Sequence, residues 1–325
     1  MAAALALALL LFPSAGALAL EAEELVPGGS AVGIDLETTG VMVVGLSDVE
    51  TAQGPVRPAE AAGLQVGDVI LRVGQRSTDS AAAFLTAMRE ADGKALELTL
   101  NRGGEELRLS ATPAQNLEGA YQLGLWLRDG VSGIGTVTFY DPQTGVFGAL
   151  GHGINDVETG ELLPFDAGCI TGAMVVDVIP GASGTPGELC GQFDREEILG
   201  ALEKNTESGI FGTAPLPAGS APIPVAHEDE VQLGPAWIRS NVSGSEVRDY
   251  TVEISRIYRD AEDNRFLLLT VTDPELLAVT GGIVQGMSGS PILQNGKLVG
   301  AVTHVLLNNP QKGYGISIDR MLRAA

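Results

Sequence analysis

The sequence predicts a mainly β protein of two domains that follow an apolar N-terminal segment. Its 325 residues match the length of two ordinary domains. The 43 glycines and 17 prolines, set against 5% aromatic residues, indicate many turns and short strands rather than a helical bundle. With 45% hydrophobic and 18% charged residues, the chain is also too apolar to be disordered.

The charge balance excludes some classes of partner. Asp and Glu number 41 and Lys and Arg 19, which gives a net charge of −22. We therefore expect no nucleic acid as partner and no docking on anionic lipid through a basic patch.

Cys169 and Cys190 flank a loop rich in Gly and Pro, and the sequence is consistent with either a disulfide or a pair of thiols. Since no His has a ligand spacing with them, we expect no metal and no cofactor.

Residues 1–20 are apolar apart from Pro13, Ser14 and Gly16. Ala17-Leu18-Ala19 is a small-x-small pattern that a signal peptidase can cut, although no basic residue precedes Arg57. A signal peptide and an uncleaved membrane anchor are both consistent with this length. Either predicts that the remaining chain works outside the cytoplasm.

Residues 24–115 predict a first, α+β domain. Ser80 is placed to cap a helix, and Arg102-Gly103-Gly104 is placed to join two alternating strands. The expected elements are strands at Val41–Val44, Val69–Val73, Ala95–Leu100 and Glu106–Ser110, and helices at Ala59–Ala62 and Ala81–Glu90.

The stretch Ala62–Gln75, AGLQVGDVILRVGQ, resembles a PDZ domain. PDZ domains bind a peptide tail as an added strand, with its C-terminal carboxylate on the backbone amides of a glycine-rich loop. By position, this resemblance places the loop near Val32, Gly33 and Ile34. The alternative is that these glycines are ordinary turn residues and that the groove is unused.

Residues 117–325 predict a second domain, a β-barrel or sandwich built from short strands. One segment, Arg195–Lys204, is the best candidate for a helix there. The expected strands are Leu123–Leu127, Gly135–Tyr140, Met174–Ile179, Ile210–Thr213, Val231–Leu233, Ala236–Arg239, Asp249–Ile257 and Phe266–Val271.

The segment Gly286-Met287-Ser288-Gly289-Ser290-Pro291 predicts a nucleophilic serine. The flanking glycines allow a sharp turn that exposes the Ser288 hydroxyl, and the Gly286 and Ser288 amides are placed to form an oxyanion hole. The segment resembles the nucleophile loop of chymotrypsin-like proteases, with Met287 at their usual Asp position, which suggests a different route of activation. A plain turn between two strands is the alternative.

A serine nucleophile needs a base, and the chain has three histidines. His152 lies on a Gly-flanked loop upstream of Ser288, in the order that the chymotrypsin fold uses. His227 lies in an acidic loop and is expected to be a solvated surface residue. Val302, Thr303 and His304 follow the nucleophile and are expected to form a substrate-binding strand, with a core histidine as the alternative role for His304.

Spacing does not choose the acid that orients the histidine from Asp156, Asp177, Asp194, Asp249, Asp260 and Asp273. The stretches Thr272–His304, Lys312–Ile316, Ala149–Ile154 and Gly133–Tyr140, together with the PDZ layout, resemble the SpoIVB-type sporulation serine peptidases. That resemblance implies a PDZ domain followed by a chymotrypsin-like double β-barrel. It also implies a triad of His152, Asp273 and Ser288. A structural cap before Pro274 is the alternative role for Asp273.

The resemblance further implies an exported endopeptidase that acts between the two forespore membranes. Its partner would be a membrane-anchored regulator of an intramembrane protease, whose release lets a sigma factor mature. Self-cleavage is expected near Leu18 to Pro27 or in the loop before the PDZ core. The other functions that fit are a quality-control protease with a PDZ domain and a non-catalytic PDZ adaptor.

Overall fold

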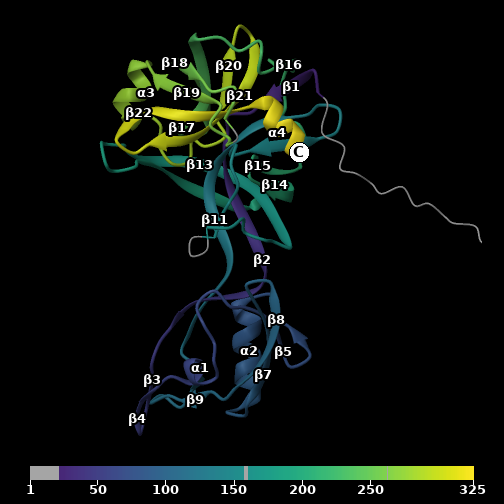
Figure 1. The fold of residues 1–325 in the computed structure, drawn as a ribbon, viewed down its shortest axis with the longest axis vertical. Coiled ribbons are helices and arrows are strands. Elements are labelled where there is room, and N and C mark those ends of the chain that lie inside the picture. The colour runs from purple at the N-terminus through teal and green to yellow at the C-terminus, as the bar shows by residue number, and fades with distance from the viewer. Residues whose placement is uncertain (1–21, 157–159, 262) are drawn as a thin grey trace, which may run out of the picture.

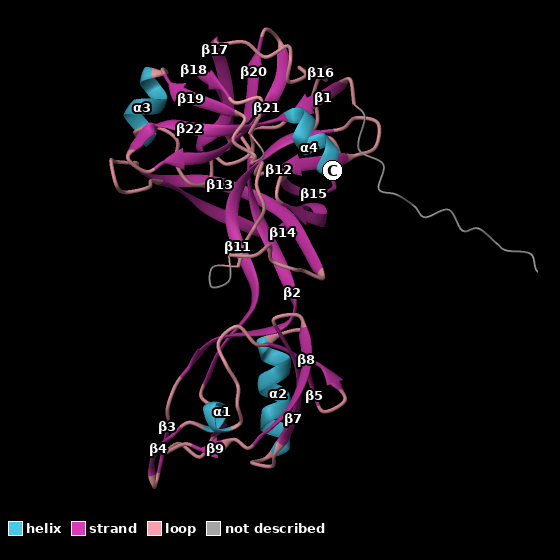
Figure 2. Ribbon diagram, viewed as in Figure 1, coloured by secondary structure: helices cyan, strands magenta, loops and turns pink. Residues whose placement is uncertain are grey.

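The computed structural model describes residues 22–156, 160–261 and 263–325, so the predicted N-terminal segment, residues 1–20, lies outside them. Two lobes are joined by the long strands β2 (Ala31–Leu46) and β11 (Leu125–Tyr140), as Figure 1 shows. Strands dominate both lobes, and the few helices are short (Figure 2). Among the described residues, no helix is long and apolar enough to cross a membrane.

Six strands close into a first barrel in the larger lobe. The sheet runs from β11 to β2, and a further pairing between β2 and β11 closes the ring. Val32, Val137, Phe147 and Ile170 fill it. Besides β2 and β11 the ring contains β12 (Val146–Ala149), β15 (Gly209–Thr213), β14 (Glu188–Thr206) and β13 (Ala167–Ile179), and β1 (Glu24–Pro27) and β16 (Ile223–Pro224) extend it.

The C-terminal part of the chain forms a second closed barrel of six strands. Ile238, Val252, Leu269 and Ile292 are fully or almost fully buried in its core. Two barrels of six strands confirm the predicted mainly β, double-barrel fold. The elements are β17 (Gly234–Ser243), β18 (Glu246–Ile257), β19 (Leu267–Val271), α3 (Pro274–Thr280), β20 (Pro291–Gln294), β21 (Lys297–Leu306), β22 (Asn309–Ser317) and α4 (Ile318–Ala324).

The smaller lobe is the PDZ domain, packed around Phe84 and Met88 of its longer helix. The Ser80 hydroxyl accepts a hydrogen bond from the Ala83 amide, which confirms the predicted cap. Its elements are β3 (Val49–Thr51), β4 (Gly54–Val56), α1 (Pro58–Ala61), β5 (Val69–Val73), β6 (Arg76–Ser77), α2 (Ala81–Ala91), β7 (Leu96–Arg102), β8 (Glu105–Ala111), β9 (Ala114–Gln115) and β10 (Tyr121–Gln122).

The PDZ domain is inserted into the first barrel, which differs from the predicted order of residues 24–115 followed by 117–325. The first half of β2 pairs with β13 and β11 inside the barrel, and its second half pairs with β5 of the PDZ domain. One strand therefore belongs to both lobes. An apolar run shows that a strand exists but not which sheet it enters, so the sequence did not reveal the insertion.

Two predicted elements are wrong. Arg195–Lys204 is not a helix but part of β14, whose pairing with β13 and β15 closes the barrel and overrides its helical pattern. Val231–Leu233 is not a strand, although Val231 is buried against the second barrel.

The Gly67-Asp68 turn of the PDZ signature contains a buried carboxylate. Asp68 is 0% exposed and accepts hydrogen bonds from Arg102 Nε at 2.6 Å, Arg102 Nη2 at 2.8 Å and the Gln65 amide at 2.9 Å. These three hydrogen bonds offset the cost of burying the Asp68 carboxylate.

We expect Asp68→Ala to destabilise the PDZ domain by about 2 kcal/mol, since it removes the buried acceptor of three hydrogen bonds and leaves the Gln65 amide without its partner. Hydrogen exchange should speed up in β5, β7 and α2 and stay unchanged in the second barrel. The control is Asp79→Ala, an exposed carboxylate in the same lobe. Equal exchange in the two variants would contradict a structural role for Asp68.

Candidate active site

The loop that carries Ser288 is held against β11 by hydrogen bonds to its backbone oxygens. The Thr136 amide donates to Ser288 O at 3.0 Å, Thr136 Oγ1 to Gly286 O at 2.8 Å and Thr138 Oγ1 to Gly289 O at 2.8 Å. Within the described chain, the Gly286 and Ser288 amides donate to no acceptor. They are therefore available to an oxyanion, as the sequence predicts.

Gly289 is required for this close approach. Its φ is +96°, and a Cβ there would lie 2.0 Å from the Thr136 oxygen and 2.6 Å from the Leu150 nitrogen. Any larger residue would push the nucleophile loop away from β11.

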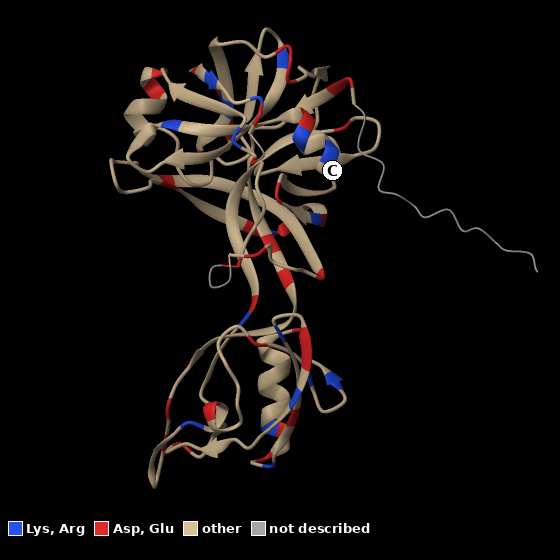
Figure 3. Cartoon of the chain, viewed as in Figure 1, with Lys and Arg blue, Asp and Glu red and all other residues tan. Residues whose placement is uncertain are grey.

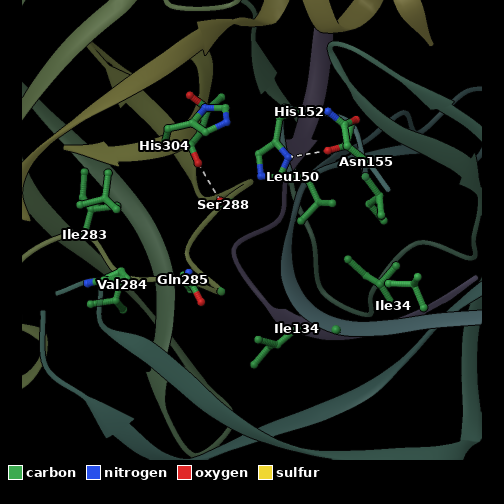
Figure 4. A pocket seen from close by; sticks show the side chains of 18 of the residues that line it. Ile34, Ile134, Leu150, His152, Asn155, Ile283, Val284, Gln285, Ser288 and His304 are labelled. Carbon is green, nitrogen blue, oxygen red and sulfur yellow. Dashed lines mark hydrogen bonds between the residues drawn. The ribbon is translucent and has the colours of Figure 1, made fainter. Parts of the chain in front are cut away.

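His152 follows β12 and faces the same cavity as Ser288 (Figure 4). Its Nδ1 lies 2.8 Å from the Gly153 oxygen, and because a carbonyl only accepts, Nδ1 carries the proton and Nε2 is the basic nitrogen. Burial lowers the pKa of His152 below its ordinary value, and the bond to Gly153 opposes this only in part. His152 is therefore neutral at pH 7, as a general base must be.

The Ser288 hydroxyl donates to the Thr303 oxygen at 2.7 Å. We expect a substrate amide that binds this carbonyl oxygen to release the hydroxyl for His152. The serine oxygen then attacks the scissile carbonyl carbon, its proton moves to His152 Nε2, and the Gly286 and Ser288 amides stabilise the oxyanion. His152 passes the proton to the leaving amine. Water then hydrolyses the acyl-enzyme and restores the serine by the same proton transfers.

His304 packs directly on the catalytic base. The ring centroids of His152 and His304 are 4.9 Å apart, with an interplanar angle of 38°. Although the residue as a whole is exposed, desolvation of its ring, together with the neighbouring His152 and Arg265, lowers the pKa of His304 to about 4. His304 lines the cavity, so it is not a core histidine.

The predicted substrate strand, Val302 to His304, is only partly free to bind a substrate. Val302 is already bonded to the nucleophile loop, because its amide donates to Ser290 O at 2.9 Å and its oxygen accepts from the Gly289 amide at 2.8 Å. Thr303, His304 and the next residue, Val305, line the cavity. The structure therefore moves the expected substrate contact along β21 by one residue.

Asp273 does not orient His152 in this structure. Its carboxylate caps α3, where Oδ1 accepts from the Glu275 and Leu276 amides and Oδ2 from the Thr251 amide. Burial by itself would raise the pKa of Asp273, but these hydrogen bonds together lower it. The residue lies outside the cavity lining, and its role here is the capping alternative. The Gly153 carbonyl holds His152 in place of a carboxylate.

Val32, Gly33 and Ile34 are not a carboxylate-binding loop. They lie in the barrel half of β2, where both strand edges are taken up by β11 and β13. Ile34 lines the active-site cavity instead. The predicted loop position is wrong because it assumed that the PDZ domain begins before β2.

The PDZ edge that the structure leaves open was missed in the sequence. Leu125–Asp129 pairs with β2 on one side, and no strand of the described chain pairs with its other side. The Ala81 amide of α2 donates to Asp129 Oδ2 at 2.7 Å, which places α2 beside this segment. Gly124, with φ of +72°, forms the turn before it, and the signal in the sequence was this glycine before an alternating strand.

The two cysteines and His227, the remaining candidate residues, lie outside the active-site cavity. Cys169 and Cys190 are free and lie opposite Ala201 and Asp177, respectively, in the β13–β14 ladder. This puts them on the order of 25 Å apart along the hairpin, so they do not form a disulfide. His227 is exposed and bonds to Asp319. Among the described residues no group of His, Cys, Asp and Glu could hold a metal.

A neutral histidine, a serine and two available amides in one cavity define a chymotrypsin-like serine peptidase that contains a PDZ domain. The sequence model of the SpoIVB peptidase S55 family matches residues 119–322, and a PDZ model matches residues 52–102. The chain belongs to the SpoIVB peptidase S55 family.

Similarity to curated proteins covers smaller parts of the chain. Zinc metalloprotease RasP of Shouchella clausii is 33% identical over 145 residues, which are 43% of this chain and 32% of that protein. Serine protease HTRA1 of Xenopus tropicalis is 38% identical over 61 residues, or 19% and 13% of the two chains. This chain therefore spans less than a third of the length of these relatives. The solved PDZ domain of an SdrC-like protein from Listeria monocytogenes is 20% identical, with a TM-score of 0.23, and the match covers 28% of this chain and 90% of that one.

Substitutions at the three predicted triad positions should separate catalysis from capping. We expect Ser288→Ala and His152→Ala to lower kcat by at least about 10⁴-fold. Asp273→Asn should keep most activity, because Asn is also a good N-cap, and Asp273→Ala should cost about 1 kcal/mol of stability. Peptide hydrolysis and urea unfolding check both. A loss near 10⁴-fold in Asp273→Asn would instead show that this carboxylate orients His152 during catalysis.

The histidine pair should make the folded protein sensitive to acid. In the unfolded chain His304 titrates near the ordinary value of about 6.5, whereas in the folded protein its pKa is about 4. Between these values the unfolded chain binds more protons, so stability falls as the pH drops from 7 to 4.

Urea unfolding midpoints at pH 7, 5.5 and 4.5 measure this loss of stability in acid. We expect the loss to be smaller in His304→Gln than in the wild type. The control is His227→Gln, because Asp319 raises the pKa of His227, and that pair stabilises the fold most at low pH. Removal of this ion pair should make the stability fall more steeply as the pH drops. Parallel curves for wild type and His304→Gln would rule the explanation out.

Proposed function

We propose that this serine peptidase cleaves a membrane-associated regulatory protein in the signalling between compartments that activates a sigma factor during sporulation. The observation that carries the proposal is that one chain combines three parts. They are an S55 peptidase domain in which Ser288 and His152 line one cavity, an inserted PDZ domain, and an apolar N-terminal segment. A peptidase confined to a membrane surface meets few proteins, and a PDZ domain adds selection among them.

The proposed location is outside the cytoplasm, with the chain exported or anchored in the cytoplasmic membrane. In a sporulating cell this is the space between the two forespore membranes. The support comes from residues 1–20, which are long and apolar enough for a signal peptide or an anchor.

The proposed role of the PDZ domain is to bind a peptide tail at the open edge of Leu125–Asp129, beside α2. A strand added there would continue the β11–β2 sheet with main-chain hydrogen bonds. The turn at Gly124 supports this site, because a Cβ at that residue would lie 2.2 Å from the Ser47 oxygen and only glycine fits.

Self-cleavage is proposed near the N-terminus, within the expected stretch from Leu18 to Pro27. The bonds inside β1 are protected, because β1 pairs with β11 on one edge and with β16 on the other. We therefore expect the cut before Glu24. The loop expected before the PDZ core is taken up by the continuous strand β2.

The proposal is tested by complementation in an endospore-forming bacterium that lacks its own S55 peptidase. We expect the full-length wild type to restore heat-resistant spores and Ser288→Ala to fail. Immunoblots check that both proteins accumulate equally, and a fluorophosphonate probe checks that only the wild type is labelled. Labelled wild type that restores no spores would overturn the sporulation role and leave the peptidase intact.

A quality-control protease with a PDZ domain is the second candidate, because a serine peptidase domain joined to a PDZ domain fits this function as well. Unfolded casein separates the two functions. Broad degradation of casein by the wild type would favour quality control, and cleavage restricted to one or a few sites would favour signalling.

A further inference from the structure

The cavity around Ser288 has a volume of about 580 Å³, large enough for side chains on both sides of a scissile bond. In Figure 4, Ile283 and Val284 lie on one side of Ser288, and Leu150 and Ile34 lie on the other. The cavity therefore continues past the nucleophile in two directions.

The first wall comes from the nucleophile loop and β21. Ile283 and Val284 precede the oxyanion amides, and Val305 and Leu307 lie at and after the end of β21. All four side chains are aliphatic. Ile283 and Val284 are each 2% exposed, so packing against the second barrel fixes these two side chains, whereas Leu307 is 54% exposed.

The second wall comes from the first barrel. Ile34 of β2 and Val131 and Ile134 of β11 line it, together with Leu150 and Ile154 beside His152. These residues are aliphatic as well. Ile34, Val131 and Ile134 belong to the strands that close the barrel, so their positions are fixed by its hydrogen bonding.

No Asp, Glu, Lys or Arg lines the cavity in the described part of the chain. Charged side chains are instead spread over both lobes and over the strands that join them (Figure 3). The polar lining side chains are uncharged at pH 7: Asn155, Gln285, Ser288, Thr303, His152 and His304. A charged substrate side chain would lose its hydration here and gain no partner.

We propose that the enzyme cuts between two aliphatic residues in an extended, uncharged segment, with one side chain on each wall of the cavity. This inference rests on the proposed function only in using the same Ser288 site. It names the chemical class of the substrate segment, which the family assignment does not. Adjacent aliphatic residues are usually buried in folded proteins, so the target segment has to be exposed in an extended form.

The test uses purified full-length enzyme and internally quenched peptides that differ only on the two sides of one bond. We expect kcat/KM for a Leu-Val pair to exceed that for an Ala-Ala pair by roughly 10–200-fold per side chain. Peptides with Asp or Lys at either position should be cleaved more slowly still. Equal cleavage of aliphatic and charged peptides would overturn the inference.

Two variants assign the walls. Leu307→Lys should shift the preference toward Asp at one substrate position only, and Val131→Lys should shift it at the other position only. Each readout is a ratio of kcat/KM for Asp and Leu peptides, so a general loss of activity does not affect it. The matched control is Leu233→Lys, an exposed leucine outside the cavity, which should leave both ratios unchanged.

Labelling of the wild type by a fluorophosphonate separates the two ways of failing. A labelled enzyme that shows no aliphatic preference contradicts this inference and leaves the peptidase assignment standing. An enzyme that is neither labelled nor active on any peptide contradicts both.

Discussion

The antiparallel pair of β2 and β11 is the constraint on which the rest of the structure depends. Its barrel half closes the first ring of six strands, and its outer half forms part of the PDZ sheet. The same strand β11 then holds the nucleophile loop through Thr136 and Thr138. The barrel, the recognition domain and the oxyanion amides are thus arranged around one ladder of backbone hydrogen bonds.

The catalytic base is positioned without a carboxylate. The Gly153 carbonyl fixes the tautomer of His152, and the His304 ring packs against its face. Both neighbours are neutral, so neither supplies the negative charge of an aspartate. The Gly153 bond raises the pKa of His152, but by less than burial lowers it. The net effect is a His152 pKa below its ordinary value, and a weaker base has less driving force to take the serine proton.

Local chemistry was predictable from the sequence and long-range pairing was not. Ser80 and Arg102-Gly103-Gly104 identify a cap and a hairpin turn within a few residues, and both are found. His152 and Ser288 were found because a nucleophile and its base are restricted to few residue types. Asp273 and the Val32–Ile34 loop were misplaced because their roles depend on contacts between distant segments. The helix predicted at Arg195–Lys204 was wrong for the same reason, because barrel closure rather than local propensity decides the conformation of this segment.

The insertion of the PDZ domain within a paired strand determines how the protein can be dissected. Cutting the chain after residue 115 would leave β2 on one fragment and β11 on the other, so neither fragment would contain a complete first barrel. Met42 and Arg128 lie opposite each other in the ladder. A two-residue hairpin turn of the Asn-Gly kind could join them, which would delete the whole recognition domain and leave the peptidase as one uninterrupted double barrel.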